Sequence, residues 1–450
     1  MANMIIEFSK YAIILFMAFY TLECFTVFRY ATEDERNGIY IRQNVLMFLI
    51  HFVSFVVLCL ETKNSMLIIF YALQQITLFA TIALYRVIYP KANRLIVNNM
   101  CLLLTVSFVI LTRLSYDKSV KQFKIVVVST ILTMFIPFLV RKIKIISKFA
   151  WIYALAGIGA LGIVMILGQV TNGSKISYSI GGYTFQPSEF VKILFVLTIA
   201  GMLAKSSDFL HVIITAAVAG AHVLILVCSK DLGSALIFFI VYFVMIYVAT
   251  KNPLYLLLGL AGGAGASMVA YKLFSHVRVR VQAWKDPLGT IENAGYQIAQ
   301  SLFAIGTGGW FGMGLEQGAP NKIPVVEADF IFAAISEELG GIFGACLILV
   351  CVSCFVMFMN ISMKLKDEFY KLIAVGLAVM YGFQVFLTIG GVTKFIPLTG
   401  VTLPLVSYGG TSVLTTLIMF AIIQGLYILR VDDDVRKTKQ NTKKRRRNKS

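Results

Sequence analysis

One aspartate stands where a side chain could do acid–base chemistry. Asp329 lies just before a long apolar stretch, so its carboxylate would be partly desolvated and its pKa raised toward that of a general base. The start of a helix acts in the opposite direction, because its dipole stabilises the charged form. An aspartate just before a helix also caps it by default. The residues alone leave two interpretations of Asp329 open, a catalytic base and a helix cap.

Two more carboxylates, Glu337 and Glu338, follow inside the same apolar stretch. If this stretch spans a membrane, ionisable groups there are costly and indicate function. Asp329 and Glu337 would be roughly 12 Å apart along a helix, so they cannot form a close carboxylate pair. We expect one of the two glutamates to bond a basic side chain or a backbone break in a neighbouring helix. Polar contacts that only join helices are the alternative.

A second polar group occurs at Glu189 and Lys192, which stand three residues apart at the start of another apolar stretch. On a helix they share one face and are expected to pair. A buried ion pair is costly unless other groups share it, and a bound anionic headgroup would be such a group. The segment 397–410 mixes helix breakers with hydroxyl side chains, which at membrane depth is tolerated only around a cavity.

Five glycines crowd the segment 306–314. Because each costs about 1 kcal/mol against alanine in a helix, this segment is not expected to be a regular helix. It predicts a turn-rich segment with close backbone approach. Its amides could cradle a phosphate, or the segment could simply allow tight packing. The sequence leaves both possibilities open.

Composition places most of the chain in a membrane. Of the 450 residues, 58% are hydrophobic and 14% are charged, whereas about a quarter are charged in a soluble domain. The formal charge of +18 is concentrated partly in the last twenty residues, which hold nine basic and three acidic side chains. This composition excludes a disordered or collagen-like chain, a disulfide-stapled secreted domain and an ordinary nucleic-acid-binding protein.

Thirteen apolar stretches approach the length of about 20 residues that a membrane-spanning helix needs. Their apolar runs are continuous, whereas the strands of a membrane barrel alternate, so we predict an all-α polytopic membrane protein. The predicted spans are 11–28, 45–60, 65–85, 98–112, 125–140, 149–168, 190–204, 209–228, 232–249, 254–274, 331–359, 369–392 and 411–429.

Orientation is predicted from the Lys and Arg residues of alternate loops. The two sides carry nearly equal numbers, so the basic tail, residues 431–450, decides, and we place it in the cytoplasm at anionic lipid. An odd number of spans then puts the N-terminus outside. The polar loops 169–189, 229–231, 275–330 and 393–410 all face out. Chemistry is therefore expected at the outer leaflet, where ATP is not available.

Six motifs in a fixed order resemble the SEDS family of bacterial cell-wall proteins, the FtsW, RodA and SpoVE group. The resemblance covers residues 98–430 and implies a ten-helix core with a large extracellular loop at 275–330. Three extra helices in residues 1–97 precede it. One departure is Lys230, in the Ser-Lys pair that replaces the family's usual Gln-Pro. The motifs are QPSExxK, DLGSA, DPxG with a downstream YQIAQS, AIGTGGWFGMGL, ADFIFAxxxEELG and PLTGVTLPLVSYGGTS.

The resemblance implies a peptidoglycan glycosyltransferase that polymerises lipid II at the outer leaflet. Asp329 matches the family's essential aspartate, thought to activate the 4-hydroxyl of the acceptor sugar, which favours the catalytic interpretation. Arg278 and Arg280 are expected to bind the pyrophosphate. No residue cluster demands a metal, although a divalent cation could help the leaving group. The other positions expected to bind substrate are Glu189, Lys192, Glu338 and Ser407.

Two alternative functions stay open. A lipid II flippase would use Glu189, Lys192 and Glu338 as its pathway, although charges at the outer ends of spans favour surface chemistry. A non-enzymatic scaffold for a transpeptidase would tolerate the substitution Asp329→Asn. In either case the resemblance implies a class B penicillin-binding protein as partner. It does not separate division from elongation or sporulation.

Overall fold

The computed structural model describes all residues except 1, 31, 143, 172–173, 182 and 448–450. Among the described residues, thirteen helical segments are long and apolar enough to cross a membrane, and each coincides with a predicted span. The predicted all-α polytopic fold is therefore confirmed. The helices are α1 (Ala2–Thr26), α2 (Glu33–Thr62), α3 (Met66–Ile88), α4 (Arg94–Leu114), α5 (Tyr116–Thr133), α6 (Ile136–Lys142), α7 (Ala150–Leu167), α8 (Pro187–Lys205), α9 (Phe209–Cys228), α10 (Leu232–Thr250), α11 (Pro253–Leu273), α12 (Ser275–Lys285), α13 (Tyr296–Gly308), α14 (Ile331–Lys364), α15 (Glu368–Val392) and α16 (Gly410–Arg447).

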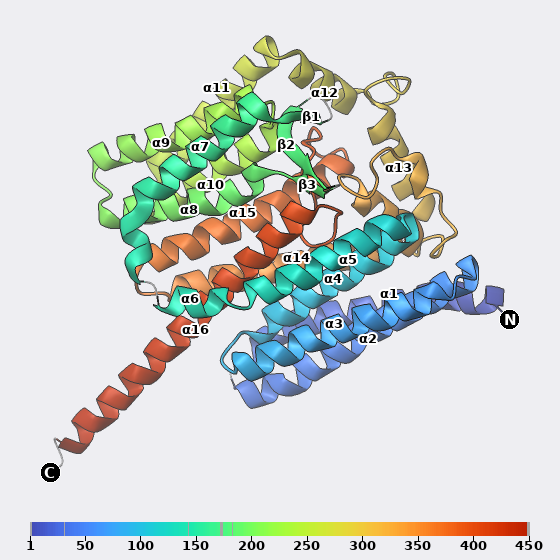
Figure 1. Cartoon of the computed structure of the whole chain (residues 1–450), viewed down its shortest axis with the longest axis horizontal. Coiled ribbons are helices and arrows are strands. Elements are labelled where there is room, and N and C mark those ends of the chain that lie inside the picture. The colour runs from blue at the N-terminus through green and yellow to red at the C-terminus, as the bar shows by residue number, and fades with distance from the viewer. Residues whose placement is uncertain (1, 31, 143, 172–173, 182, 448–450) are drawn as a thin grey trace.

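The helices lie side by side in one bundle whose two ends differ (Figure 1). The helices α12 and α13 lie toward one end, and the last part of α16 extends beyond the opposite end. The N- and C-termini lie at opposite ends of the bundle, as an odd number of crossings requires.

The first three helices form a layer against the rest of the bundle (Figure 1). α1 packs on α14 and α2 packs on α4. Buried polar side chains join these layers: the Tyr20 hydroxyl donates to Asn99 Oδ1 (3.1 Å), Asn99 Nδ2 donates to Ser353 Oγ (3.3 Å), and Asn98 Nδ2 donates to Gln43 Oε1 (3.0 Å). Such bonds are the usual polar contacts between membrane helices. They tie α1 and α2 to α4 and α14.

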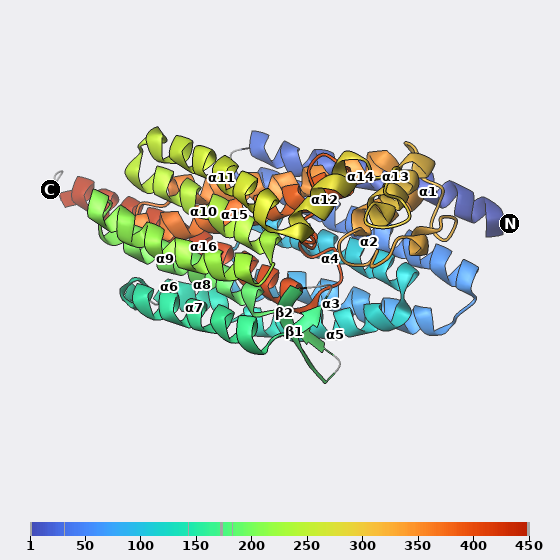
Figure 2. The same cartoon turned by 90° about the horizontal axis from the view of Figure 1, so that it is seen from above.

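A small antiparallel sheet, which was not predicted from the sequence, lies in the loop 169–189. Its strands are β1 (Gln169–Thr171), β2 (Ser174–Ile180) and β3 (Tyr183–Phe185), in the order β1-β2-β3. β2 contacts α7, and Figure 2 shows the hairpin beside that helix at the edge of the bundle. Strands this short carry little periodic signal.

Helix α14 is broken at Gly340, which adopts φ 86° and ψ 167°. The break frees two carbonyls of the preceding turn: Glu337 O accepts from Met313 N, and Glu338 O accepts from Gly314 N, each at 2.9 Å. A backbone polar group buried in a membrane must find a partner, and the glycine-rich segment supplies it here.

The glycine-rich segment is only partly as predicted. Helix α13 continues through Gly308, so the first of the five glycines are helical, contrary to expectation. The rest form a turn in which Gly309, Gly312 and Gly314 have positive φ. Gly341 N donates to Gly309 O at 2.8 Å. These backbone bonds favour the tight-packing interpretation over a phosphate cradle.

The substitution Gly340→Ala is expected to destabilise the protein. Its backbone conformation is essentially restricted to glycine and costs another residue about 1–3 kcal/mol. A Cβ atom would also lie 2.4 Å from Gly312 N. The melting temperature in detergent should fall clearly below that of Gly306→Ala, where a Cβ would meet nothing within 4 Å. Equal melting temperatures for the two variants would contradict this account of the break.

Candidate functional site

A cavity of about 580 Å³ opens among the starts of α5, α8, α10 and α16. This volume lies within the range of about 300–1,000 Å³ that is usual for ligand sites. The segment 397–410, predicted to surround a cavity, contributes part of its wall, as do residues of β2 and β3. The charged side chains of the wall are Lys118, Glu189, Lys230, Asp231, Arg280, Glu327 and Asp329.

Asp329 and Arg280 converge on one point of this wall. A Cβ atom at Gly400 would lie 3.5 Å from Asp329 Oδ2 and 4.0 Å from Arg280 Nη2. Gly400 itself has φ 75°, in the left-handed region that favours glycine. The cap position of α14 belongs to Phe330, where no side chain caps the helix. Capping therefore does not explain the position of Asp329.

The surroundings of Asp329 raise the pKa of its carboxyl group. Burial raises the pKa of its carboxyl from 3.8 to about 6, the charge of Arg280 acts in the opposite direction, and the charge of Glu327 raises the pKa further. A carboxylate with this pKa is mostly ionised at neutral pH and still accepts a proton far more readily than an ordinary aspartate.

The two arginines singled out from the sequence have different surroundings. Arg280 lines the cavity, and its Nη1 donates to Thr399 O at 3.2 Å. The same helix is held by Trp284, whose Nε1 donates to Lys394 O at 3.1 Å. Arg278 is exposed and does not line the cavity. The structure thus brings Arg280 and not Arg278 to Asp329.

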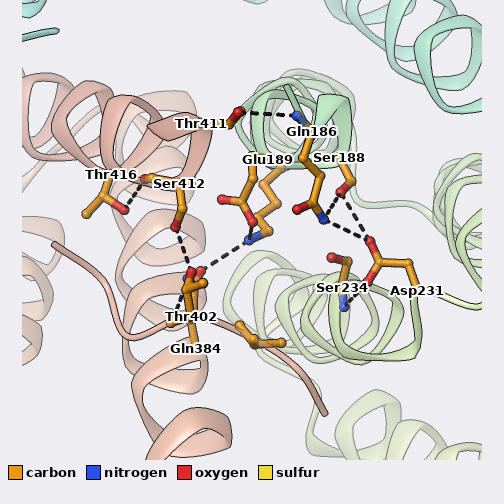
Figure 3. Close-up of polar contacts among 12 residues, drawn as sticks. Gln186, Ser188, Glu189, Asp231, Ser234, Gln384, Thr402, Thr411, Ser412 and Thr416 are labelled. Atoms are coloured by element: carbon orange, nitrogen blue, oxygen red, sulfur yellow. Dashed lines mark hydrogen bonds and ion pairs between the residues drawn. The ribbon is translucent and has the colours of Figure 1, made fainter. Parts of the chain in front are cut away.

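The predicted pair of Glu189 and Lys192 is confirmed (Figure 3). Lys192 Nζ donates to Glu189 Oε1 at 2.7 Å and to Gln384 Oε1 at 3.2 Å, and its side chain is only 1% exposed. The group that shares this buried pair is therefore the side-chain amide of Gln384, on α15. Its Nε2 in turn donates to Thr402 O at 3.0 Å. Glu189 lines the cavity, while Lys192 lies behind it.

A neighbouring network fixes the acidic start of α10 (Figure 3). Asp231 Oδ1 accepts from Ser234 N at 3.2 Å and so caps that helix. Its Oδ2 accepts from the Ser188 hydroxyl at 3.1 Å and from Gln186 Nε2 at 3.4 Å. Gln186 and Ser188 belong to the QPSE motif, so the motif joins the starts of α8 and α10 at the cavity.

Ser407 does not line the cavity and is 2% exposed. Its hydroxyl donates to Ala328 O at 2.6 Å and accepts from Leu403 N at 2.9 Å. The adjoining Tyr408 N donates to Glu327 O at 2.8 Å. Ser407 therefore holds the last loop against the two residues that precede Asp329, which makes it a positioning residue.

Glu338 also does not line the cavity. It accepts from Arg113 Nε of α4 at 2.8 Å, and the same nitrogen lies 3.1 Å from Glu316 Oε2. Arg113 Nη2 also donates to Gly318 O at 3.2 Å. This agrees with the expectation that one of the two glutamates bonds a basic side chain.

Two lysines of the cavity wall, Lys118 and Lys230, were not predicted as site residues from the sequence. Lys118 of α5 forms an ion pair with Glu327, and Lys230 lies two residues after the end of α9 with φ 62°. Lys230 had appeared only as a departure from a motif, and Lys118 stands in no motif at all. In the described part of the chain, no group of three or more His, Cys, Asp or Glu side chains is arranged to hold a metal ion.

Comparison with known proteins gives relatives by sequence. The Cell cycle protein family of FtsW, RodA and SpoVE matches residues 93–430. The peptidoglycan glycosyltransferase RodA of Mycobacterium tuberculosis is 36% identical over 304 residues, 62% of this chain and 63% of that protein. Stage V sporulation protein E of Bacillus subtilis is 36% identical over 267 residues, 57% of this chain and 71% of that protein. The chain thus spans less than two thirds of the mycobacterial relative.

Two solved structures share the fold. A chain of a peptidoglycan synthase complex that coordinates polymerization and crosslinking has a TM-score of 0.63 at 24% identity, covering 75% of this chain and 98% of that one. RodA of Thermus thermophilus has a TM-score of 0.54 at 22% identity, covering 75% of this chain and 96% of that one. With a family match over residues 93–430 and this common fold, the chain belongs to the FtsW/RodA/SpoVE family.

Proposed function

We propose that this protein is a peptidoglycan glycosyltransferase that polymerises lipid II into glycan strands. The observation that carries the proposal is the convergence of the Asp329 carboxylate and the Arg280 guanidinium beside Gly400 in one cavity. The proposal is supported by relatives that are themselves named peptidoglycan glycosyltransferases.

The reaction needs a base at one sugar and positive charge at the other. Asp329 accepts the proton of the acceptor's 4-hydroxyl while that oxygen attacks the anomeric carbon of the donor. The bond from this carbon to the lipid pyrophosphate breaks, and the pyrophosphate leaves with the electron pair. No nucleotide is consumed, because the donor already carries its leaving group.

The leaving pyrophosphate fits the cationic part of the wall. Arg280, Lys118 and Lys230 all line the cavity. Lys118 is engaged with Glu327, whereas Arg280 donates to the neutral carbonyl of Thr399. A guanidinium binds phosphate oxygens in a forked geometry, and fixed positive charge stabilises the negative charge that develops there. We therefore assign the leaving-group role to Arg280.

We also propose that the cavity faces the outer leaflet and that α16 ends in the cytoplasm. The basic tail and the opposite positions of the two termini support this orientation. A class B penicillin-binding protein is the proposed partner. The fold shared with a chain of a peptidoglycan synthase complex supports this pairing.

The test is polymerisation of fluorescent lipid II by the purified protein with its transpeptidase partner, alongside lipid II transport across liposomes. Long glycan strands made by the wild-type protein would support the glycosyltransferase. Transport of lipid II without strand formation would replace the proposal with a flippase. Monodisperse elution in detergent serves as the folding control in both assays.

The substitution Glu327→Gln is expected to extend activity to lower pH. Asp329 must be ionised to act as a base, so polymerisation by the wild type should fall as the pH drops through about 6. The charge of Glu327 raises the pKa of Asp329, and its removal should lower the midpoint of this fall. Rates measured between pH 5 and 8 check this.

The matched control is Glu292→Gln, which removes the same charge from an exposed residue of the same loop outside the cavity. Its midpoint should equal that of the wild type. A midpoint for Glu327→Gln that equals the midpoint of the control, or lies above it, would contradict the assignment of the fall in rate at low pH to Asp329.

A further inference from the structure

A second cavity, of about 330 Å³, lies between α13 and the start of α14, outside the site described above. Half of its ten lining residues have polar side chains, and one has an aromatic ring. The residues that carry the argument are Gln300, Phe303, Thr307, Gln317, Lys322 and Glu337.

The carboxyl group of Glu337 is held in place in the wall of this cavity. Its Oε1 accepts from Ala319 N at 2.9 Å, whereas its Oε2 has no hydrogen-bond partner among the described residues. The residue is 6% exposed. A Cβ atom at Gly308 would lie 2.7 Å from Glu337 Cα, and one at Gly318 would lie 3.1 Å from its Cδ. Two glycines thus let the backbone close around a carboxyl group whose second oxygen has no hydrogen-bond partner among the described residues.

The chemistry of the lining points to a sugar. A carboxylate accepts hydrogen bonds from hydroxyl and acetamido groups, and a side-chain amide both donates to them and accepts from them. The half-exposed ring of Phe303 offers an apolar face to a pyranose. A cation site would need several oxygen ligands, and here Lys322 stands in the same wall as the single carboxylate.

One short segment separates this cavity from the catalytic one. Lys322 and Ile323 line the second cavity, and Val325 and Glu327 line the first. Two residues of extended chain, Ile323 to Val325, span only about 7 Å. Gln297 Nε2 donates to Pro324 O at 3.4 Å and holds the segment to α13. The walls of the two cavities therefore adjoin at this segment.

We propose that the cavity around Glu337 is a binding subsite for the amino-sugar strand that the catalytic cavity produces. The proposal rests on the glycosyltransferase function. A strand held there stays attached between additions, so the subsite would govern how long strands grow.

The first test is strand length at equal lipid II consumption. Glu337→Gln keeps an oxygen for Ala319 N and changes the carboxyl group that lines the cavity, and Gln300→Ala removes a partly buried lining side chain of α13. Both should give shorter strands than the wild type. The control is Asn321→Ala, which changes an exposed neighbour of Lys322 that does not line the cavity and should leave length unchanged. Strands of wild-type length from both cavity variants would overturn the proposal.

The second test is direct binding of tetra-N-acetylchitotetraose to the purified protein with its partner. Loss of one hydrogen bond should weaken binding about tenfold in Glu337→Gln, while Asn321→Ala should bind like the wild type. Equal affinity of Glu337→Gln and the wild type, or no binding by the wild type, would overturn the subsite. This readout is independent of polymerisation, so failure of the proposed function appears separately, as absence of strands from the wild type.

Discussion

Replacing Asp329 with Asn is expected to abolish glycan polymerisation in a protein that still folds. The amide keeps the shape of the carboxyl group but cannot accept the proton of the attacking hydroxyl. Loss of a general base typically costs 10²–10⁴-fold in rate. Lipid II polymerisation with the transpeptidase partner measures the effect, and elution in detergent with the melting temperature checks the fold.

Asp117→Asn is the matched control for this substitution. It makes the same chemical change in an exposed residue of α5 that does not line the cavity. It should polymerise like the wild type. If Asp329→Asn polymerised lipid II at the rate of this control, the aspartate would have no part in the chemistry. That result would favour the non-enzymatic scaffold. Asp329→Glu, which retains a base at a longer reach, should restore part of the activity lost in the amide variant.

The membrane spans could be predicted because the bilayer imposes a length on each of them. Every predicted stretch coincides with a helix of the structure. The pair of Glu189 and Lys192 could be predicted for a similar reason, since a spacing of three on a helix fixes which side chains meet. Both predictions rest on geometry within a single element.

Contacts between segments far apart in the sequence could not be predicted in this way. Arg113 and Glu338 lie 225 positions apart, and no periodicity connects them. The ion pair of Lys118 and Glu327 crosses 209 positions in the same way. Composition indicated that such charges needed partners, but packing of the helices alone decided which ones they found.

The surroundings of Asp329 depend both on its own segment, which the sequence describes, and on contacts with distant segments, which it does not. Its place before an apolar stretch suggested desolvation, which fits a pKa of about 6. The sequence could not rank Arg278 against Arg280, because two residues along α12 turn a side chain to a different face of the helix. Nor could it show that Gly400 lies beside Asp329, since that contact depends on how the last loop folds back.

The substitution Arg113→Met is expected to cause a large loss of stability. In its ion pair with Glu338 the two side chains are 9% and 1% exposed. Removing the cation leaves the buried Glu338 carboxylate without compensation, and Glu316 loses the same partner. Breaking a buried pair in this way costs about 3–5 kcal/mol. Unfolding of the purified protein in detergent measures the change.

Two comparisons identify burial as the cause. Arg42→Met breaks a pair with Glu23 in which the arginine is 59% exposed, and it should cost less than about 1 kcal/mol. Replacing Arg113 and Glu338 together by apolar residues should recover part of the loss, because the more deeply buried of the two stranded carboxylates is then removed with the cation. If Arg113→Met were as stable as Arg42→Met, the pair would not be what holds the segment around Gly318 between α4 and α14. The loss should extend to polymerisation, since the segment from Gly318 leads directly into the residues that line the cavity around Asp329.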